Sequence, residues 1–355
     1  MKKHLLAAAL LTACAVPSGE DVARTSQRIQ GGATESGSTF AVSVLSNGSI
    51  CSGTLIAPNL VLTARHCVAS DTGRDFVDCT KDTFLTPNPA TSFHVSFSVD
   101  APDTGEYAVA KVFVPDEKLF CGGDIALLML TENVGAAVAK PATPAIDPPL
   151  TDRKKYGSKL VAIGYGTTAI GASDDGTRRR RDNVPINCIP GDSTLGCSGS
   201  EYDITTSELA AGDGLCEGDS GSGAYEPTSL AAGAPIVMGV LSRAGEQGTK
   251  CIDSVYSRTD SHGAFLKAAA NQAAMLGSYP APAWAGESGG DGGTSGGPST
   301  MPTPEGPDGD DAGAAKPTTT TTTSSGGCAV GGAGPSGGLA FALVLLAFGR
   351  MRRRR

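Results

Sequence analysis

The chain has 355 residues, 40% of them hydrophobic, which is enough to bury the core of one large domain or two small ones and excludes a small scaffold held together by disulfides alone. The formal net charge is −8, and the basic residues clustered at both ends leave the region between them more acidic still. Because an acidic body repels phosphate backbones, we expect no nucleic-acid partner.

The first 14 residues are typical of an export signal. Lys2 and Lys3 precede a short apolar stretch, which is too short to span a membrane as a stable helix. The segment Leu11-Thr12-Ala13-Cys14 resembles a bacterial lipobox, in which the thiol of Cys14 would be lipidated; ordinary cleavage after Ala13-Cys14-Ala15 is the alternative. Residues 15–28 would then be a propeptide, and the body of the protein would lie outside the cytoplasm.

The central region, residues 29–277, contains short alternating apolar runs separated by Gly, Pro and Asp, a pattern that predicts β-strands. These runs are Phe40 to Val44, Phe93 to Val99, Tyr107 to Val109, Val112 to Val114, Leu160 to Ile163, Ile236 to Leu241 and Val255-Tyr256. We assign the basic run from Arg178 to Arg181 to a solvated loop or strand edge. One helix is predicted, over Ser261 to Leu276, with Asp260 as its candidate N-cap and Gly277 as its end.

Two further segments follow this helix. Residues 278–327 are rich in Gly, Pro, Ser and Thr, cannot bury a core, and are expected to form an extended tether. Residues 328–355 begin at Cys328 and pass through an apolar stretch to terminal arginines, which cannot cross a membrane. They resemble the myxobacterial-type C-terminal sorting tail, with Cys328 as the processed cysteine; a plain membrane anchor is the alternative. We therefore expect the protein at the cell envelope or cell surface, from which it could be released.

Within the central region, one histidine is well placed for chemistry. His66 lies at the end of the predicted strand Leu62 to Cys67, and a disulfide at Cys67 would hold its imidazole in place, as a general base requires. Of the other two histidines in the body, His94 alternates with apolar residues on a strand and is expected to face solvent, whereas His262 opens the helix. His66 is therefore the candidate catalytic histidine.

A serine and an aspartate complete the set of candidates. Ser220 lies in Cys216-Glu217-Gly218-Asp219-Ser220-Gly221, where the glycines allow a tight turn whose backbone amides can stabilise an oxyanion. Asp124 precedes the apolar strand Ile125 to Leu128, so its side chain is either buried beside a partner or a cap at the start of the strand.

In the chain order His66, Asp124, Ser220, these segments resemble the trypsin-like (chymotrypsin-fold) serine peptidases. The resemblance extends from residue 29 to about residue 270. Besides the histidine segment, it rests on Arg28-Ile29-Gln30-Gly31-Gly32, Cys51-Ser52-Gly53-Thr54-Leu55-Ile56, Asp124-Ile125-Ala126-Leu127-Leu128, Gly164-Tyr165-Gly166, Gly218-Asp219-Ser220-Gly221 and Ser254-Val255-Tyr256. It implies an all-β fold of two six-stranded antiparallel β-barrels with a C-terminal helix, and an active site in the cleft between the barrels.

The resemblance also implies a role for each candidate residue. Ser220 would be the nucleophile, His66 the general base and then acid, and Asp124 the group that fixes the imidazole tautomer. The backbone amides of Gly218 and Ser220 would form the oxyanion hole. The expected activity is the hydrolysis of peptide bonds in protein or peptide substrates through an acyl-enzyme, with no cofactor and no metal ion.

Activation is a second implication of the resemblance. Cleavage after Arg28 would free the α-amine of Ile29, which in this family pairs with the aspartate at the position of Asp219, because a buried charge requires a partner. The intact chain is therefore expected to be a zymogen that needs an activating protease.

Once Cys14 and Cys328 are set aside, eight cysteines remain, an even number that suits four disulfides in an exported protein. They show no C-x-x-C or paired Cys/His spacing that would indicate zinc. The resemblance pairs Cys51 with Cys67 and Cys216 with Cys251. The remaining four allow three pairings, of which proximity in the sequence favours Cys79 with Cys121 and Cys188 with Cys197.

The resemblance also suggests a substrate preference. Gly214 would lie at the floor of the primary specificity pocket, where trypsins carry Asp, and Asp213 is one place away. Ala244 and Ser254 would narrow the pocket walls. We therefore expect a preference for small or medium apolar residues over Arg and Lys, so that the enzyme would not readily cleave its own junction after Arg28.

The chain departs from the family pattern at two places. Arg65 stands where the family usually has a small residue, and Ser222-Gly223 replaces the usual glycine and proline after the nucleophile. Neither change removes a catalytic group. A non-catalytic surface binding protein on a peptidase scaffold, and an esterase that uses the same triad, are the alternatives to a peptidase.

Overall fold

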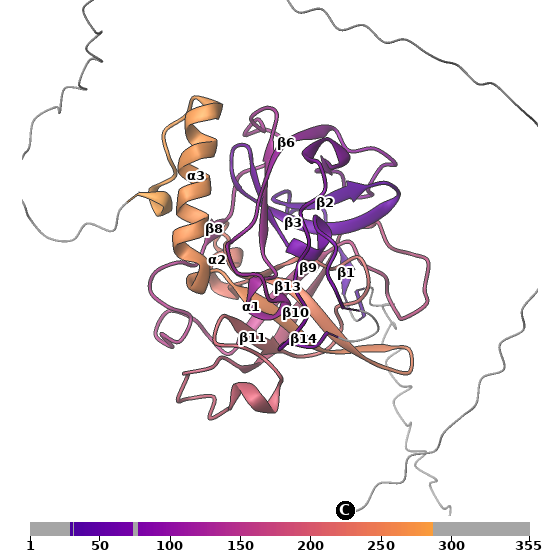
Figure 1. Cartoon of the computed structure of the whole chain (residues 1–355), viewed down its shortest axis with the longest axis vertical. Helices are drawn as coiled ribbons and strands as arrows, with labels where there is room; N and C mark the ends of the chain where they lie inside the picture. The colour runs from indigo at the N-terminus through magenta and orange to yellow at the C-terminus, as the bar shows by residue number, and fades with distance from the viewer. Residues whose placement is uncertain (1–28, 31, 74–76, 287–355) are drawn as a thin grey trace, which may run out of the picture. The chain divides into compact units, whose positions relative to one another are not determined.

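The computed structural model describes residues 29–30, 32–73 and 77–286, and two closed six-stranded antiparallel barrels make up this part of the chain (Figure 1). The architecture confirms the fold implied by the sequence. The first barrel closes in the order β2-β3-β4-β7-β6-β5. Its strands are β2 (Ala41–Ser46), β3 (Ser49–Ala57), β4 (Leu60–Thr63), β5 (His94–Ser96), β6 (Tyr107–Phe113) and β7 (Ala126–Leu130).

The second barrel closes in the order β9-β10-β11-β14-β13-β12. Its strands are β9 (Lys159–Gly164), β10 (Arg179–Cys188), β11 (Glu208–Ala211), β12 (Gly223–Tyr225), β13 (Ile236–Gln247) and β14 (Lys250–Arg258). Two short strands join its sheet: β1 (Ala33–Thr34) pairs with β10, and β8 (Thr143–Pro144) runs parallel to β13.

Alternating side chains explain why these segments form barrels. In β2, Val42 and Val44 point into the first core together with Phe93 and Val95, because every second side chain of a strand faces the same side. Each barrel has a core of its own, and that of the second barrel includes Ile29, which is fully buried. Every apolar run that predicted a strand overlaps one in the structure.

Helices are few in the described residues. They are α1 (Phe120–Gly123), α2 (Pro227–Ala231), α3 (Gly263–Gly277) and the 3₁₀ turns η1 (Arg65–Cys67), η2 (Ala90–Ser92), η3 (Gly199–Glu201), η4 (Asp260–His262) and η5 (Ala283–Ala285). The predicted N-cap of the long helix is wrong. The carboxylate of Asp260 binds the guanidinium of Arg258 and the amide of Leu150 instead, so the 3₁₀ turn η4 precedes α3.

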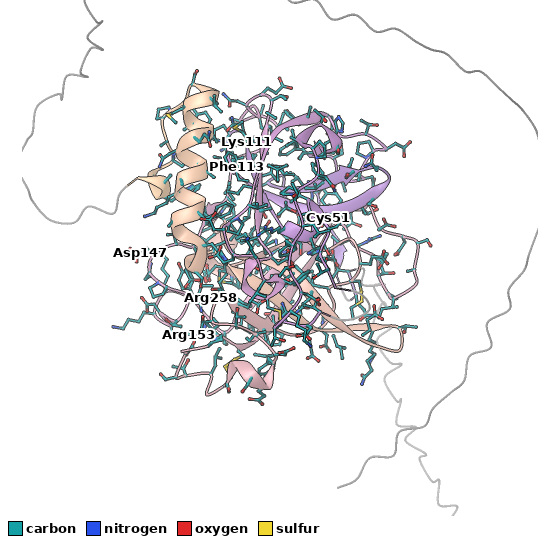
Figure 2. All side chains as sticks on the ribbon, viewed as in Figure 1. Cys51, Lys111, Phe113, Asp147, Arg153 and Arg258 are labelled. Carbon is teal, nitrogen blue, oxygen red and sulfur yellow. A yellow bond between two sulfur atoms is a disulfide. The ribbon has the colours of Figure 1, made fainter. Side chains whose placement is uncertain are left out.

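Helix α3 packs against the first barrel. Lys111 on β6 donates from Nζ to Gln272 on α3 over 3.1 Å and lies over the ring of Phe113 (Figure 2). Residues 278–286, which the composition assigned to the tether, also contact the domain: Tyr279 donates to Asn59, and Ala285 is buried. None of the helices in the described residues combines the length and apolar character that a membrane crossing needs.

The basic run contradicts its predicted exposure. Arg178 and Arg179 are only 1% and 2% exposed, and Arg179 begins strand β10. Arg178 lies where the barrels meet and donates to the carbonyls of Glu35, Ala41 and Phe97. Five N–H donors in one plane can satisfy several carbonyls at once, which makes the burial of this guanidinium tolerable.

Candidate active site

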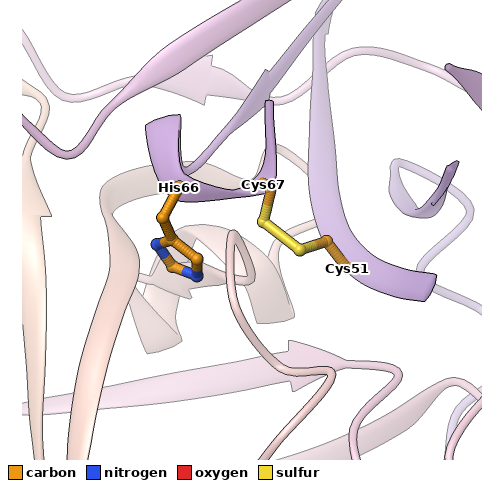
Figure 3. Close-up of side chains that lie close together, drawn as sticks. All are labelled: Cys51, His66 and Cys67. Carbon is orange, nitrogen blue, oxygen red and sulfur yellow. A yellow bond between two sulfur atoms is a disulfide. The ribbon is translucent and has the colours of Figure 1, made fainter. Parts of the chain in front are cut away.

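His66 lies in the 3₁₀ turn η1, directly after strand β4 of the first barrel. The disulfide between Cys51 and Cys67 ties this turn to β3, so the residue next to the histidine is fixed covalently (Figure 3). The sulfur atoms and the imidazole lie within 4.8 Å of one another. They do not form a metal site, because metal binding requires thiolates and these two sulfurs are bonded to each other.

The carboxylate of Asp124 orients the imidazole of His66 by hydrogen bonds. It is fully buried, its Oδ2 accepts a hydrogen bond from Nδ1 of His66 over 2.8 Å, and its Oδ1 accepts one from the backbone amide of His66 over 2.9 Å. Ser242 on β13 donates to Oδ2 over 2.7 Å, and Ser257 on β14 donates to the carbonyl of Asp124 over 2.7 Å. Both barrels therefore orient this carboxylate, and the acceptor at Nδ1 leaves Nε2 free to take a proton.

His66 and Asp124 shift each other's pKa values. Burial by itself would lower the pKa of His66, but the charge of Asp124 and its hydrogen bond outweigh burial and raise this pKa. Burial would raise the pKa of Asp124, and the histidine together with Ser242 outweighs it, so the net pKa is lowered. At neutral pH, Asp124 is therefore ionised and able to stabilise an imidazolium.

Ser220 stands on a tight turn of the second barrel. The turn is closed by hydrogen bonds from the amide of Asp219 to the carbonyl of Cys216 and from the amide of Ser222 to the carbonyl of Asp219. Gly221 has a φ of +82°, and a β-carbon there would collide with the backbone of β3. Glycine is therefore required at this position, and the turn carries the serine to the barrel interface.

The same turn leaves two amides unused. The carbonyl of Glu217 accepts from the amide of Thr167, which directs the N–H of the Glu217–Gly218 peptide the opposite way. Within the described residues, neither the amide of Gly218 nor that of Ser220 donates a hydrogen bond. Two amides of one turn that donate no other hydrogen bond can accommodate an anionic oxygen if both face it.

His66 and Ser220 face one cavity of about 390 Å³ between the barrels. Within the described residues, no hydrogen bond joins the side chains of His66 and Ser220. Hydrogen bonds between catalytic groups often shorten only when substrate binds. Of the predicted pocket residues, Ala244 lines the cavity beside Leu215 and Leu241, whereas Gly214 and Ser254 are buried outside its lining. Of the other histidines, His94 lines a separate cavity and His262 is buried against the backbone.

Asp219 is buried beneath the serine turn. Its two oxygens accept from the amides of Gly166 and Cys216 over 2.8 and 2.9 Å, and within the described residues no basic group lies within ion-pair distance. Burial raises the pKa of this carboxyl to about 7. Gly164 and Gly166 pack directly against it, where β-carbons would collide with the carboxylate, so the Gly-Tyr-Gly motif makes room for Asp219.

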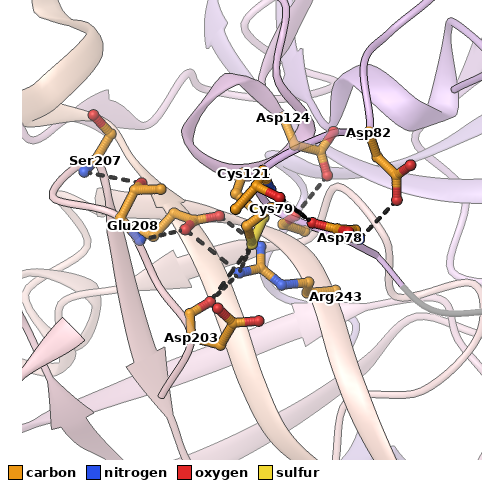
Figure 4. Close-up of a disulfide and its surroundings, with 12 residues drawn as sticks. Asp78, Cys79, Asp82, Cys121, Asp124, Asp203, Ser207, Glu208 and Arg243 are labelled. Carbon is orange, nitrogen blue, oxygen red and sulfur yellow. Dashed lines mark hydrogen bonds and ion pairs between the residues drawn. A yellow bond between two sulfur atoms is a disulfide. The ribbon is translucent and has the colours of Figure 1, made fainter. Parts of the chain in front are cut away.

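All four predicted disulfides are present. They join Cys51 with Cys67, Cys79 with Cys121, Cys188 with Cys197 and Cys216 with Cys251. Figure 4 shows Cys79–Cys121 beside Arg243, whose guanidinium binds the fully buried carboxylate of Glu208 over 2.6 Å and the carbonyl of Asp203. Arg28, Cys14 and Cys328 lie outside the described residues.

Three residues of this site lie in no motif that predicts their role. Ser242 and Ser257 bind Asp124, and Arg243 lines the cavity. Ser242 lies within β13 and follows the apolar run Ile236 to Leu241 directly, so a polar residue at the end of that run was the only local signal. Their role depends on strands β13 and β14 reaching across to the other barrel.

A family model described as trypsin matches residues 28–264. The chain belongs to the trypsin family.

This trypsin-family chain is 25% identical over 226 residues to phenoloxidase-activating factor 3 of Holotrichia diomphalia, and the aligned region covers 61% of this chain and 63% of the relative. It is 31% identical over 185 residues to kallikrein 1-related peptidase b27 of Mus musculus, covering 50% and 65%. It is 30% identical over 254 residues to chymotrypsin-like elastase family member 1 of Macaca fascicularis, covering 65% and 84%. The chain thus spans less than two thirds of the first two relatives.

Proposed function

We propose that this protein is a serine endopeptidase that hydrolyses peptide bonds through an acyl-enzyme. The observation that carries the proposal is the hydrogen bond from His66 to a buried, ionised Asp124 at the edge of the cavity that Ser220 also lines. An imidazole held in this tautomer can take the serine proton at Nε2. Family membership supports the same activity.

Each residue then has a step in the reaction. Ser220 Oγ attacks the substrate carbonyl while His66 takes its proton, and the amides of Gly218 and Ser220 bind the oxyanion. The imidazolium next to Asp124 gives the proton to the leaving amine. Water enters, His66 again acts as base, and the acyl-enzyme is hydrolysed, so the serine is regenerated.

The direct test is labelling with a fluorophosphonate after cleavage at Arg28, followed by hydrolysis of a peptide and of the matching ester. A peptidase is expected to be labelled at Ser220 and to turn over both. An unlabelled, folded domain would contradict the proposal and favour a binding module, and turnover of the ester alone would favour an esterase.

We also propose that the intact chain is a zymogen in which Asp219 awaits the α-amine of Ile29. Ile29 is fully buried in the second barrel, and Asp219 is buried without a basic partner among the described residues. A new ammonium group beside Asp219 would remove the cost of ionising it. Together, these observations support cleavage after Arg28 as the activating step.

The Asp219→Asn variant tests this pairing by its pH dependence. With a pKa of about 7 when folded, compared with about 3.8 when unfolded, Asp219 makes the intact wild type less stable as pH rises from 4 to 7. Between pH 5 and pH 8 that loss is roughly 3 kcal/mol. Over the same range, the free energy of unfolding of the variant is therefore expected to rise by this amount relative to that of the wild type, as measured by urea titration.

The variant should also gain no activity on cleavage. A gap between the two proteins that is independent of pH would contradict the raised pKa of Asp219 in the intact chain, and full activation of the variant would contradict the pairing.

We propose that the pocket prefers small or medium apolar residues over Arg and Lys. Leu215, Leu241 and Ala244 line it. Behind it, a β-carbon at Gly214 would collide with the guanidinium of Arg181, which donates to the carbonyl of Gln30. A cation behind the floor disfavours a basic substrate side chain.

Peptide-library profiling of the activated domain measures this preference. The value of kcat/KM is expected to be at least about tenfold higher for Ala, Val or Leu before the scissile bond than for Arg or Lys. A dominant preference for Arg or Lys would overturn this expectation and would make self-activation at Arg28 feasible.

We propose an extracytoplasmic location, since four disulfides form and persist in oxidising compartments. Because cleavage after Arg28 separates Cys14 from the body, membrane attachment of the active form would rest on residues 328–355. Deleting those residues is expected to move active enzyme from the membrane fraction into the medium. Activity that stays with the membranes after the deletion would contradict this role.

A further inference from the structure

Arg65, next to the catalytic histidine, is buried in an unusual way. Its side chain is only 6% exposed, and within the described residues it contacts no carboxylate at ion-pair distance. Its Nη1 donates instead to the carbonyls of Pro115 and Glu117, over 3.2 and 2.5 Å. Burial lowers the pKa of this guanidinium. A buried guanidinium with no carboxylate in direct contact is costly, which indicates that its side chain has a structural role.

The guanidinium also begins a stack of rings that ends at the active site. The Cζ atom of Arg65 lies 4.7 Å from the centre of the Phe84 ring. Phe84 stacks on Phe120 with 5.0 Å between centroids and 20° between planes, and Phe120 stacks on the imidazole of His66 with 6.0 Å and 19°. Three nearly parallel rings and the guanidinium, from three separate segments, therefore form one continuous series of contacts, here called the column.

The backbone around this column is fastened at several points. The amide of Phe84 donates to the carbonyl of Lys118, and the amide of Phe120 donates to the carbonyl of Asp82. The carbonyls that Arg65 binds belong to the loop that leads to Phe120 and then to Asp124. The disulfide Cys79–Cys121 also joins these two segments (Figure 4). The segments that carry Phe84 and Phe120 are therefore fastened to each other, so a shift of one is passed to the other.

The hydrogen bond from Nδ1 to Asp124 fixes one edge of the imidazole. Rotation about this hydrogen bond would still tilt the plane of the ring. Phe120 covers one face of that plane and lines the cavity. We propose that Arg65 is a positioning residue of the catalytic histidine, which holds Phe120 against the imidazole through Phe84. The inference rests on the proposed peptidase function, because a fixed ring plane matters when Nε2 must meet Ser220.

The test replaces Arg65 by methionine, which keeps the apolar stem but removes the cation and the donors. In the activated enzyme, with active sites counted by fluorophosphonate titration, kcat is expected to fall by about tenfold to a hundredfold while KM changes little. Arg65→Lys, which keeps a cation over Phe84, is expected to recover most of the loss. The matched control is Arg180→Met, whose half-buried side chain binds Asp182 away from the site and should leave kcat unchanged.

A second variant keeps the proposal falsifiable if Arg65→Met does not fold. Phe84→Leu leaves Arg65 in place and breaks the column, so it is expected to lower kcat by a similar factor. The double variant should then be no slower than the slower single variant, because both changes remove the same support. Losses that simply multiply, or a kcat per active site equal to that of the wild type, would overturn the positioning role.

A readout without catalysis separates this inference from the function on which it rests. In the Ser220→Ala background, nuclear Overhauser contacts between the ring protons of Phe120 and His66 are expected, and Arg65→Met should weaken them. Contacts that persist unchanged would overturn the inference even in an active enzyme. An activated wild type that hydrolyses no peptide would overturn the proposed function, whatever the ring contacts show.

Discussion

The Ser220→Ala variant of the activated protein is expected to hydrolyse peptides about 10⁶-fold more slowly in kcat than the wild type, because it lacks the hydroxyl that would form the acyl-enzyme. The hydroxyl is the only part of the side chain removed, and the turn is held by backbone hydrogen bonds, so the variant should fold and bind substrate. The ratio of the two kcat values is measured by stopped-flow and steady-state peptide hydrolysis. The enzyme concentration is taken from the protein mass.

Ser222→Ala is a close control for this variant. Ser222 lies two residues away, is fully buried, and its hydroxyl has no hydrogen-bond partner within the described residues. Its removal should leave kcat near that of the wild type. If Ser220→Ala retained substantial activity, or if Ser222→Ala lost as much, the assignment of Ser220 as nucleophile would be wrong.

The Asp124→Asn variant is expected to lose about 10⁴-fold in kcat near neutral pH. Three groups donate to the carboxylate: Nδ1 and the amide of His66, and Ser242. An amide can present its NH₂ group to Nδ1, and the imidazole then carries its proton on Nε2, where it cannot accept the proton of Ser220.

The pH profile of this variant gives a second readout. Asp124 raises the pKa of His66, so its removal lowers that pKa. The residual activity should therefore persist to lower pH than in the wild type, whose activity falls once the imidazole is protonated. Asp71→Asn is the matched control, because Asp71 lines the same cavity and also raises the pKa of His66 but makes no hydrogen bond to it. A similar loss of kcat in both variants would show that charge alone, and not the tautomer, is what Asp124 supplies.

Local patterns carried much of the prediction. Alternating apolar residues placed three strands of each barrel, since the period of two follows from the backbone of a strand, but strands β10, β11 and β12 fell in no predicted run. The four disulfides were also anticipated, two by resemblance to a family and two because cysteines close in sequence meet most easily. His66, Asp124 and Ser220 could be singled out because each lies in a short motif.

Contacts between distant segments could not be predicted in this way. Arg178 and Arg179 belong to a basic run that a solvated loop would suit, yet carbonyls from several distant segments surround them. Asp260 precedes a helix and fits an N-cap, but Arg258 and the amide of Leu150 hold its carboxylate. In each case, the expectation from the local sequence was wrong because the side chain binds groups that only folding brings into contact with it.

By itself, the sequence determined the strand pattern and the short motifs around His66, Asp124 and Ser220, because these depend on spacing along the chain. The two-barrel fold and two of the cysteine pairs followed from the resemblance of those motifs to a known family. Only the tertiary structure decided which charges are buried and what surrounds them: the carboxyl of Asp219, which meets no basic side chain at ion-pair distance in the described part of the chain, and the column from Arg65 through Phe84 and Phe120 to His66. The physical reason is that burial and electrostatic environment are properties of neighbours in space, and those neighbours come from both barrels.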